Sequence, residues 1–389
     1  MPKAPNTPLS CIFAINKPTG QPSMTLLNKL QPLFSTSALF KDQNQQPEAP
    51  QKGGKGSKGR RGKWRDERVK MGQGGTLDPL ADGVLVIGTN QATKQLSQFL
   101  DCTKSYRAIA LLGCSTDSYD SDGKVVKTSH WEGITEEMVK EKLSLFSGEI
   151  EQTPPVYSAL KMDGKPLYEY ARSNLPLPRP IPSRKVTISQ IDLVSFTSGP
   201  ERTDSYEYPK EHLDEKARLE IERLEKMVKE GRTVIPTEDE VVKNEVGESE
   251  STTEKEVESV ESETTSGERP PIFEISLTVS SGTYIRSVIH DLGIALGSSA
   301  HVVKLTRTRQ GQFSLSPSTT TSTSTSSSSE EVEESERGCV EWTMLEKEIE
   351  RADKIKKGSQ ETKDEVEKER DAEGWLEWER EVLRLCKTV

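Results

Sequence analysis

Short apolar runs separated by polar turns mark the first half of this chain. Residues 11–20, CIFAINKPTG, form an apolar run that ends in a Pro-Thr-Gly turn, which is typical of a buried strand. Residues 104–113, KSYRAIALLG, predict another strand. Helical apolar spacing follows Ser23, so we expect this serine to be the N-cap of a helix. A second helix is predicted over 135–146, with Thr135 as its N-cap and glutamates in its first turn.

The second half carries the same kinds of signal in a different order. Residues 184–196 alternate as a half-buried strand, and an Asp163-Gly164 pair predicts a hairpin. Residues 271–297 predict a strand, a Ser-Ser-Gly-Thr turn and a helix, and residues 361–386 predict one amphipathic helix. This irregular alternation favours an α+β fold, with a central mixed or antiparallel sheet flanked by helices, over a doubly wound parallel sheet.

Three interruptions of the apolar pattern define the expected domain organisation. The periodicity is lost in a basic stretch, in an acidic stretch and in a Ser/Thr-rich run, and such compositions bury too little apolar surface to fold. The predicted segments are one folded domain (10–34, 69–198 and 271–315), a basic flexible insertion (35–68), an acidic disordered insertion (199–270), a Ser/Thr-rich linker (316–338) and an acidic helical tail (339–389).

Charged residues are distributed unevenly along the chain, so the net charge of the whole chain does not describe its folded part. The 389 residues carry a formal net charge of −10, and only 32% of them are hydrophobic. Residues 201–269 have 22 acidic and 11 basic side chains and residues 330–389 have 20 and 12, so the rest of the chain is basic, at +9. A basic folded part suits a polyanionic partner such as nucleic acid. The nine basic residues within 51–70 indicate a solvated insertion, an RNA-contacting arm or a nuclear-import patch.

Several classes of protein are not indicated by the sequence. The cysteines have neither CxxC nor Cys/His spacing, so we expect neither a disulfide framework nor a zinc site. No apolar run is long enough to span a membrane, and the N-terminus lacks a signal-peptide core, so the chain is expected to be reduced and intracellular. The motifs of P-loop nucleotide enzymes, α/β-hydrolases and HExxH metalloproteases are missing.

The strongest candidate for chemistry is Asp78, in the stretch GGTLDPLADGVLVIG. The two glycines give the loop a permissive backbone, and the flanking leucines partly desolvate the carboxylate. Such an aspartate needs a cationic partner to remain ionised. An aspartate before a proline is also a common turn residue. Asp82 follows four residues later, which leaves open a carboxylate pair of the glycosidase kind.

A second candidate site is the stretch SSGTYIRS, residues 280–287. If this stretch begins extended, Tyr284 and Arg286 face the same way, and they suit stacking on a base and pairing with a carboxylate. Tyr106 lies near the start of a predicted strand, where it is either a core tyrosine or a third aromatic of the site. His290 lies on a predicted helix and is interpreted as structural.

Five segments together resemble, in order and spacing, the TruB family of tRNA pseudouridine synthases, especially its fungal members. They are INKPTG, GQGGTLDPLADGVLVIGTNQATK, KSYRAIALLG, TPPVYSALKMDGKPLYEYAR and SSGTYIRSVIHDLG. The resemblance covers about residues 10–198 and 271–315, and it implies the pseudouridine synthase fold. No RNA-binding domain of the PUA type is recognised after residue 330, so RNA affinity would depend on the folded core and the basic patch.

The resemblance implies a role for each main candidate. Asp78 corresponds to the family's catalytic aspartate, which attacks the target nucleoside or abstracts a sugar proton. Tyr106 corresponds to the tyrosine that stacks on the flipped base. Tyr284 corresponds to an active-site tyrosine that accepts a proton, and Arg286 to the arginine that pairs with the catalytic carboxylate. The implied reaction is an isomerisation that needs no cofactor, no metal and no energy source.

Three further positions match the family less strongly. Leu305 corresponds to an apolar pocket residue. Lys17 and Pro18 match an N-terminal motif that supports the catalytic loop. Gln73 occupies a position where many members have histidine; glutamine donates a hydrogen bond to RNA but does not carry a proton. The expected substrate-binding set is therefore Tyr106, Gln73, Leu305 and Lys17.

The resemblance also implies partners and surroundings. The substrate would be uridine 55 in the T arm of tRNA, extruded from the RNA to be reached, with mRNA sites that mimic this loop as further substrates. A monomer without an obligatory protein partner or membrane, in the nucleus or mitochondrion, is expected. The alternatives are an RNA-binding helper of tRNA folding with the same fold, and a guide-RNA-dependent synthase of the dyskerin type.

Overall fold

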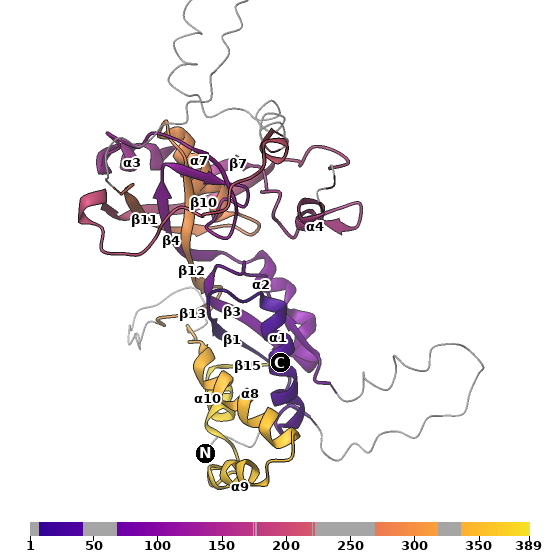
Figure 1. Cartoon of the computed structure of the whole chain (residues 1–389). Coiled ribbons are helices and arrows are strands. Elements are labelled where there is room, and N and C mark those ends of the chain that lie inside the picture. The colour runs from indigo at the N-terminus through magenta and orange to yellow at the C-terminus, as the bar shows by residue number, and fades with distance from the viewer. Residues whose placement is uncertain are drawn as a thin grey trace, which may run out of the picture. The chain divides into compact units, whose positions relative to one another are not determined.

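The protein was analysed as a computed structural model (Figure 1). The structure describes residues 8–41, 68–173, 175, 177–219, 221, 269–317 and 336–389. Most of the predicted insertions and of the Ser/Thr-rich linker therefore lies outside the described residues. The chain divides into two compact units. Unit 1 consists of residues 1–105 and 306–389, and unit 2 of residues 106–305.

Unit 1 is built on a mixed sheet, as the sequence predicted. Its strand order is β14 (Val340–Glu341), β1 (Cys11–Lys17), β3 (Asp82–Thr89) and the end of β12 (Ala300–Gln310). Strands β1 and β3 are antiparallel, whereas β14 pairs with β1 and β12 with β3 in parallel. Nearly every residue of β1 and β3 is buried, which explains their continuous apolar sequences. Three short strands extend the sheet: β2 (Met71–Gln73), β13 (Phe313–Ser314) and β15 (Lys387–Thr388).

Helix α1 (Ser23–Thr36) packs its leucines and Phe34 into unit 1. The prediction that Ser23 is the N-cap is wrong. The N-cap residue is Pro22, and the Ser23 hydroxyl bonds instead to the backbone of Leu77. A distant backbone partner has replaced the local one, because the helix start lies against another loop. Among the described residues, two further helical elements precede β4 (Lys104–Leu112): η1 (Asn90–Gln95) and α2 (Ser97–Asp101).

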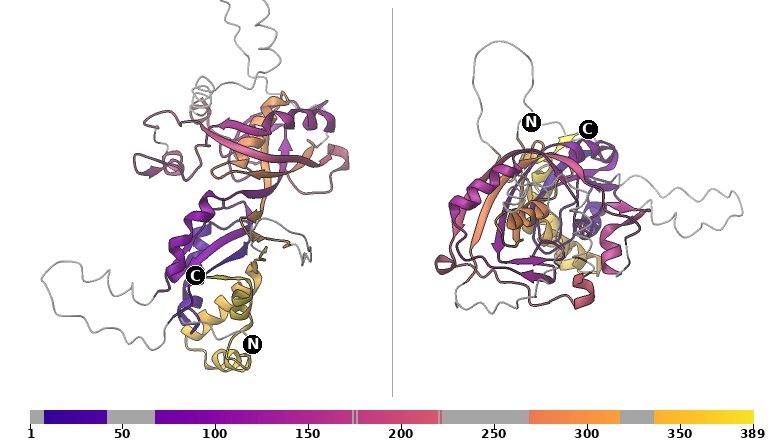
Figure 2. Two further views of the ribbon diagram at one scale, coloured as in Figure 1. Left: turned by 180° about the vertical axis from the view of Figure 1, so that it is seen from behind. Right: turned by 90° about the horizontal axis from the view of Figure 1, so that it is seen from above.

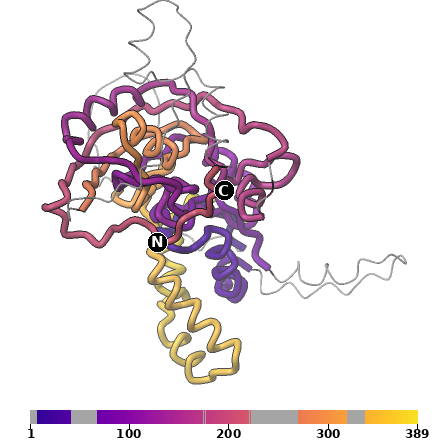
Figure 3. The backbone as a smooth tube through the Cα atoms, turned by 45° about the horizontal axis from the view of Figure 1, so that its top comes forward, coloured from indigo at the N-terminus to yellow at the C-terminus, as the bar shows by residue number. Residues whose placement is uncertain are grey.

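The C-terminal tail is helical, as predicted, and it forms part of unit 1. Its helices are α8 (Trp342–Lys356), α9 (Gln360–Lys368) and α10 (Glu377–Leu385). Figure 3 shows α8 and α9 side by side as a hairpin. The prediction of one helix over 361–386 is wrong, because the chain turns between α9 and α10. Asp371 holds this turn by accepting from the backbone N–H groups of Glu373 and Trp375 at 2.9 Å each.

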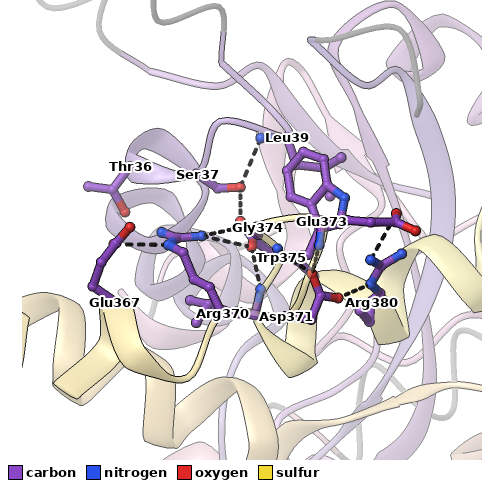
Figure 4. Close-up of polar contacts among 12 residues, drawn as sticks. Thr36, Ser37, Leu39, Glu367, Arg370, Asp371, Glu373, Gly374, Trp375 and Arg380 are labelled. Atoms are coloured by element: carbon purple, nitrogen blue, oxygen red, sulfur yellow. Dashed lines mark hydrogen bonds and ion pairs between the residues drawn. The ribbon is translucent and has the colours of Figure 1, made fainter. Parts of the chain in front are cut away.

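Helix α10 is fastened to the segment that ends α1 by one buried carboxylate and one indole. Figure 4 shows the neighbouring contacts of Ser37 with Leu39 and of Asp371 with Arg380. Glu379 is 1% exposed and accepts hydrogen bonds from the Ser37 hydroxyl and from the Leu376 N–H. The Trp378 ring lies 5.3 Å from that of Phe34 and 6.1 Å from that of Phe40. Residues 37–40, placed in the basic insertion by their composition, are therefore partly buried against the C-terminal helices.

Unit 2 has a mostly antiparallel sheet in the order β4 (Lys104–Leu112), β11 (Ile272–Val279), β10 (Arg184–Thr197) and β7 (Gly148–Gln152). β10 pairs with β11 and with β7, with two irregularities of register toward β11. The predicted strands over 104–113 and 184–196 are confirmed. Two hairpins accompany the sheet: β5 (Cys114–Thr116) with β6 (Val125–Thr128), and β8 (Lys161–Met162) with β9 (Lys165–Pro166).

Helices α3 (Glu136–Leu143) and α7 (Ile285–Ala295) contact each other in unit 2, and α4 (Leu167–Arg172) follows the second hairpin (Figure 2). Thr135 caps α3, as predicted, by accepting from the Met138 N–H at 3.4 Å. Among the described residues, the unit also contains the short helices η2 (Ser144–Phe146) and η3 (Gly199–Glu201), and residues 215–219 are helical. The hairpin at Asp163-Gly164 is confirmed, and both residues have positive φ. Among the described residues, no helix is both long and apolar enough to cross a membrane.

Candidate active site

The loop that carries Asp78 joins β2 to β3 in unit 1, and its two glycines are required sterically. A Cβ on Gly74 would lie 2.7 Å from the Cβ of Phe99, closer than real side chains approach. Gly75 has φ +131°, which is a conformation that L-residues with side chains rarely adopt. The glycines therefore allow the loop to lie flat against the unit before it reaches Asp78.

Lys17 holds the loop after Asp78. The residue is 0% exposed, and its ammonium donates to the carbonyls of Pro79 at 3.2 Å, Ala81 at 2.5 Å and Pro18 at 2.9 Å. A buried ammonium requires such acceptors, because it has left water. This geometry agrees with the expected support of the loop by Lys17. A direct contact of Lys17 with substrate stays a prediction.

Polar groups of the turn before α1 and of its first residue fix the same loop. The Thr19 hydroxyl donates to the Leu80 carbonyl at 2.6 Å, and the Gly20 N–H donates to the Pro79 carbonyl at 2.8 Å. The Ser23 hydroxyl both donates to the Leu77 carbonyl and accepts from the Leu77 N–H, at 3.0 and 3.1 Å. The residues on either side of Asp78 are thus fastened through their backbone, which leaves the carboxylate on a rigid support.

Gln73 lies at the start of the loop and is only half-buried. Its amide nitrogen donates to the Thr76 hydroxyl at 2.9 Å. Its amide oxygen is buried and has no hydrogen-bond partner among the described residues. An unsatisfied buried acceptor of this kind is energetically costly. The prediction that Gln73 contacts RNA is compatible with this position.

Arg286, in unit 2, lies in the first turn of α7 and is 3% exposed. Its guanidinium donates to the carbonyls of Ser118 at 2.5 Å and Tyr157 at 2.9 Å, and lies 3.6 Å from the carboxylate of Asp120. Because Arg286 is helical, the conditional prediction that it shares one face of an extended stretch with Tyr284 is wrong. The helix sets its direction instead.

Asp120 is a functional candidate that the sequence reasoning missed. It is 5% exposed, accepts from the Ser118 hydroxyl at 2.6 Å and forms the ion pair with Arg286. The available signal was the run of polar and acidic residues TDSYDSDG after a predicted strand. Its composition resembles an ordinary turn, so nothing local distinguished Asp120 from its neighbours.

Asp117 and Tyr157 form a second polar contact near Arg286, because the guanidinium binds the Tyr157 carbonyl. The Tyr157 hydroxyl donates to Asp117 at 3.3 Å, and the Lys124 N–H donates to the other carboxylate oxygen at 2.9 Å. Burial raises the pKa of Asp117 above its usual range and raises the pKa of Tyr157 to about 12. Tyr157 therefore remains a neutral hydrogen-bond donor, and Arg286 is the permanent charge of this cluster.

Tyr284 is the N-cap residue of α7 and is held through its backbone. Its N–H donates to Gln152 Oε1 at 2.7 Å, and its carbonyl accepts from Gln152 Nε2 at 3.0 Å. The guanidinium of Arg184 lies 4.9 Å from the centre of its ring, a cation–π contact. Tyr106 in β4 is 8% exposed and Leu305 in β12 is 4% exposed.

The predicted site residues are thus divided between the two units. In unit 1, Asp78 lies on the loop between β2 and β3, Gln73 lies at its start and Lys17 binds its carbonyls. Unit 2 contains the other predicted site residues, Tyr106, Tyr284, Arg286 and Leu305. In unit 2, Tyr284 and Arg286 are two residues apart and both belong to the start of α7. Among the described residues, no group of three His, Cys, Asp or Glu side chains is arranged to hold a metal ion.

Comparison with known proteins identifies the family of this chain. Residues 63–208 match the model of the TruB family pseudouridylate synthase N-terminal domain. The chain is 40% identical to tRNA pseudouridine synthase 4 of Schizosaccharomyces pombe, covering 78% of this chain and 79% of that one. It is 38% identical to tRNA pseudouridine synthase 4 of Saccharomyces cerevisiae, covering 77% and 76%. The crystal structure of the archaeal box H/ACA sRNP Nop10-Cbf5 complex matches with a TM-score of 0.41 at 17% identity, covering 92% of this chain and 60% of that one. At the identity found over most of both fungal chains, the protein belongs to the TruB family of pseudouridylate synthases.

Proposed function

We propose that this protein is a tRNA pseudouridine synthase that isomerises uridine 55 of the T arm, with Asp78 as its catalytic carboxylate. The observation that carries the proposal is the Asp78 loop. Its sequence matches the family's catalytic motif, and its backbone is fastened on both sides of the aspartate. The names of the two fungal relatives support tRNA as the substrate.

The reaction rearranges bonds within one nucleotide. The bond from N1 of uracil to carbon 1′ of the ribose breaks, the base rotates, and a new bond forms from C5 to carbon 1′. The hydrogen leaves C5 and N1 gains one, so atoms and electrons balance without an oxidant or reductant. In this proposal Asp78 starts the cleavage, Tyr284 takes part in the proton transfer, and Tyr106 stacks on the extruded base.

In this proposal Arg286 supplies the positive charge that the family resemblance pairs with the carboxylate of Asp78. Within unit 2 the guanidinium already has two backbone carbonyls and Asp120 around it. A planar guanidinium has five N–H donors in a fixed fork, which suits a carboxylate partner. The proposed charge pair of Arg286 with Asp78 rests on the resemblance of their two motifs to the family.

The experiment uses purified protein and one unmodified tRNA transcript. Pseudouridine is mapped by chemical labelling and primer extension for the wild type, Asp78→Ala and the matched control Asp82→Ala. We expect modification at position 55 with the wild type and Asp82→Ala only. Modification by Asp78→Ala would overturn the proposed role.

Other outcomes identify the alternatives. Unmodified tRNA that is still bound by the wild type would favour the folding helper or a missing guide RNA. We further propose that the enzyme acts as a monomer without a protein partner, that it accepts mRNA sites mimicking the T loop, and that it works in the nucleus or mitochondrion. Light scattering, short RNA hairpins and imaging of a tagged chain test these three points in turn.

A further inference from the structure

Two buried polar side chains of β12 have no role in the site described so far. Arg307 is 1% exposed and Gln310 is 0% exposed, and both belong to unit 1. Polar side chains of this size are seldom fully buried unless their groups have specific partners. The partners of both side chains are backbone carbonyls.

Gln310 binds the glycine end of the Asp78 loop. Its amide nitrogen donates to the carbonyl of Gly74 at 2.5 Å and to the carbonyl of Phe99 at 2.8 Å. Both protons of the amide are therefore used, one of them on the loop. Gly74 is also the residue whose missing side chain lets the loop approach Phe99.

Arg307 binds the next residue of the loop. Its Nη2 donates to the carbonyl of Gly75 at 3.2 Å, and its Nε donates to the carbonyl of Val84 in β3 at 2.7 Å. One guanidinium thus connects the loop to the strand that follows it. A Cβ on Gly75 would lie 3.3 Å from Gln310 Nε2, a tight contact, and the φ of +131° at this position disfavours any residue with a side chain.

The charge of Arg307 makes the arrangement costly to maintain. Among the described residues it has no ion pair with a carboxylate, and its hydrogen-bond acceptors are the two carbonyls. A second cation, Lys104, is 7% exposed and donates to the carbonyls of Leu100 and Cys102 at 2.9 and 2.7 Å. Burial lowers the pKa of Lys104, and the charge of Arg307 adds to this effect. A buried cation without a carboxylate is unfavourable, so a packing role alone would be better filled by an apolar side chain.

We propose that Arg307 and Gln310 are positioning residues for pseudouridine formation: they fix the carbonyls of Gly74 and Gly75 and thereby the direction of the loop that presents Asp78. This inference rests on the proposed catalytic role of Asp78. Together with Lys17, they fasten the loop at both ends, before Asp78 from β12 and after it from β1.

The test compares Arg307→Met, Gln310→Met and Arg307→Lys with the control Arg309→Met. Arg309 lies on the same strand, is about half exposed and pairs with Glu336. Single-turnover rate constants are measured at saturating tRNA, with tRNA affinity by filter binding and the folded fraction by circular dichroism. We expect the two methionine variants of the buried residues to lose about 30- to 100-fold in rate and less than threefold in affinity. Arg307→Lys should recover part of the loss, because an ammonium still reaches one carbonyl.

A second measurement keeps the test decisive if a methionine variant does not fold. In Gln310→Glu, an ionised carboxylate cannot donate to the Gly74 carbonyl, whereas a protonated one can. The rate of this variant relative to the wild type should therefore rise as the pH falls from 8 to 5.5. A flat ratio, or wild-type rates in folded methionine variants, would overturn the inference.

Asp78→Ala, assayed alongside, separates the two proposals. If Asp78→Ala is inactive while Arg307→Met and Gln310→Met turn over normally, the positioning inference alone fails. If Asp78→Ala remains active, the proposed catalytic role of Asp78 is wrong, and the positioning inference that rests on it is wrong as well.

Discussion

The two units hold their candidate residues in different ways. In unit 1 the carboxylate of Asp78 lies on a loop, and side chains from β1, α1 and β12 bind the carbonyls of that loop from several directions. In unit 2 Arg286 lies on a helix, whose own hydrogen bonds already fix the backbone. Its side chain then needs only two carbonyls and Asp120 to fix its direction.

The difference shows what each kind of scaffold requires. A loop has no internal ladder of hydrogen bonds, so its direction must be set by tertiary contacts with donors such as Lys17. A helix provides that ladder and leaves only the side-chain torsions to be fixed. Changes around the loop should therefore affect turnover through the backbone, whereas changes around Arg286 should affect it through the side chain.

The largest effect is expected for Arg286. Arg286→Ala should lower turnover about 1000-fold, about 4 kcal/mol at about 1.4 kcal/mol per tenfold, because the proposed site loses its permanent charge. Affinity for tRNA should change little, because the guanidinium is buried. Single-turnover kinetics and filter binding measure both. The exposed Arg107→Ala is the control, and equal losses of rate and affinity would contradict the assigned role.

The next largest effect is a loss of folding stability at low pH. It is expected in unit 2, which contains all four histidines. His301 is 0% exposed, and burial lowers its pKa to about 4 from 6.5. Between these values the unfolded chain binds a proton that the folded chain does not, so stability falls as the pH decreases through this window. The loss should total about 3 kcal/mol.

Urea denaturation between pH 7 and pH 4 measures this loss. His301→Gln should remove the dependence on pH, whereas the exposed His130→Gln should keep it. If wild type and His301→Gln lose the same stability, then His301 is not the group that responds.

A smaller effect is expected for the support of the loop. Lys17→Met keeps the length of the side chain but removes the donor of the Pro18 and Ala81 carbonyls, whereas the Pro79 carbonyl still accepts from the Gly20 N–H. We expect a loss of about 2 kcal/mol in stability, because unsatisfied buried acceptors are destabilising while the desolvation of a charge is relieved. The turnover of the folded fraction should also fall. The exposed Lys29→Met serves as control, and full activity of Lys17→Met would show that the loop holds without this donor.

The smallest effect is expected at the C-terminal helices. Glu379→Gln removes the charge that accepts from Ser37 and Leu376 and should lower stability by about 1 kcal/mol without changing turnover. Thermal melting and the tRNA assay measure the two quantities. Glu377→Gln, on the exposed side of the same helix, is the control. A loss of turnover in Glu379→Gln would assign these helices a part in the reaction.

The amino-acid sequence by itself determined much of this picture. Apolar runs gave the strands around Ile12, Ala108 and Ile188, because period and burial are encoded locally. Five ordered motifs gave the TruB family, and the loop GGTLDP identified Asp78 as a candidate with glycines that the backbone requires.

Tertiary structure decided which hydrogen bonds form between residues that are far apart in the chain. Gln310 reaches Gly74 across 236 residues and Arg286 reaches Ser118 across 168, and no local pattern records such bonds. Ser23 does not cap its helix, because its hydroxyl binds the backbone of Leu77 instead. The last predicted helix is interrupted at Asp371, because the carboxylate of this residue binds the backbone of a turn. Periodicity reports which face of an element is buried. Which polar groups meet in that buried space depends on the packing of elements, and that was settled only by the fold.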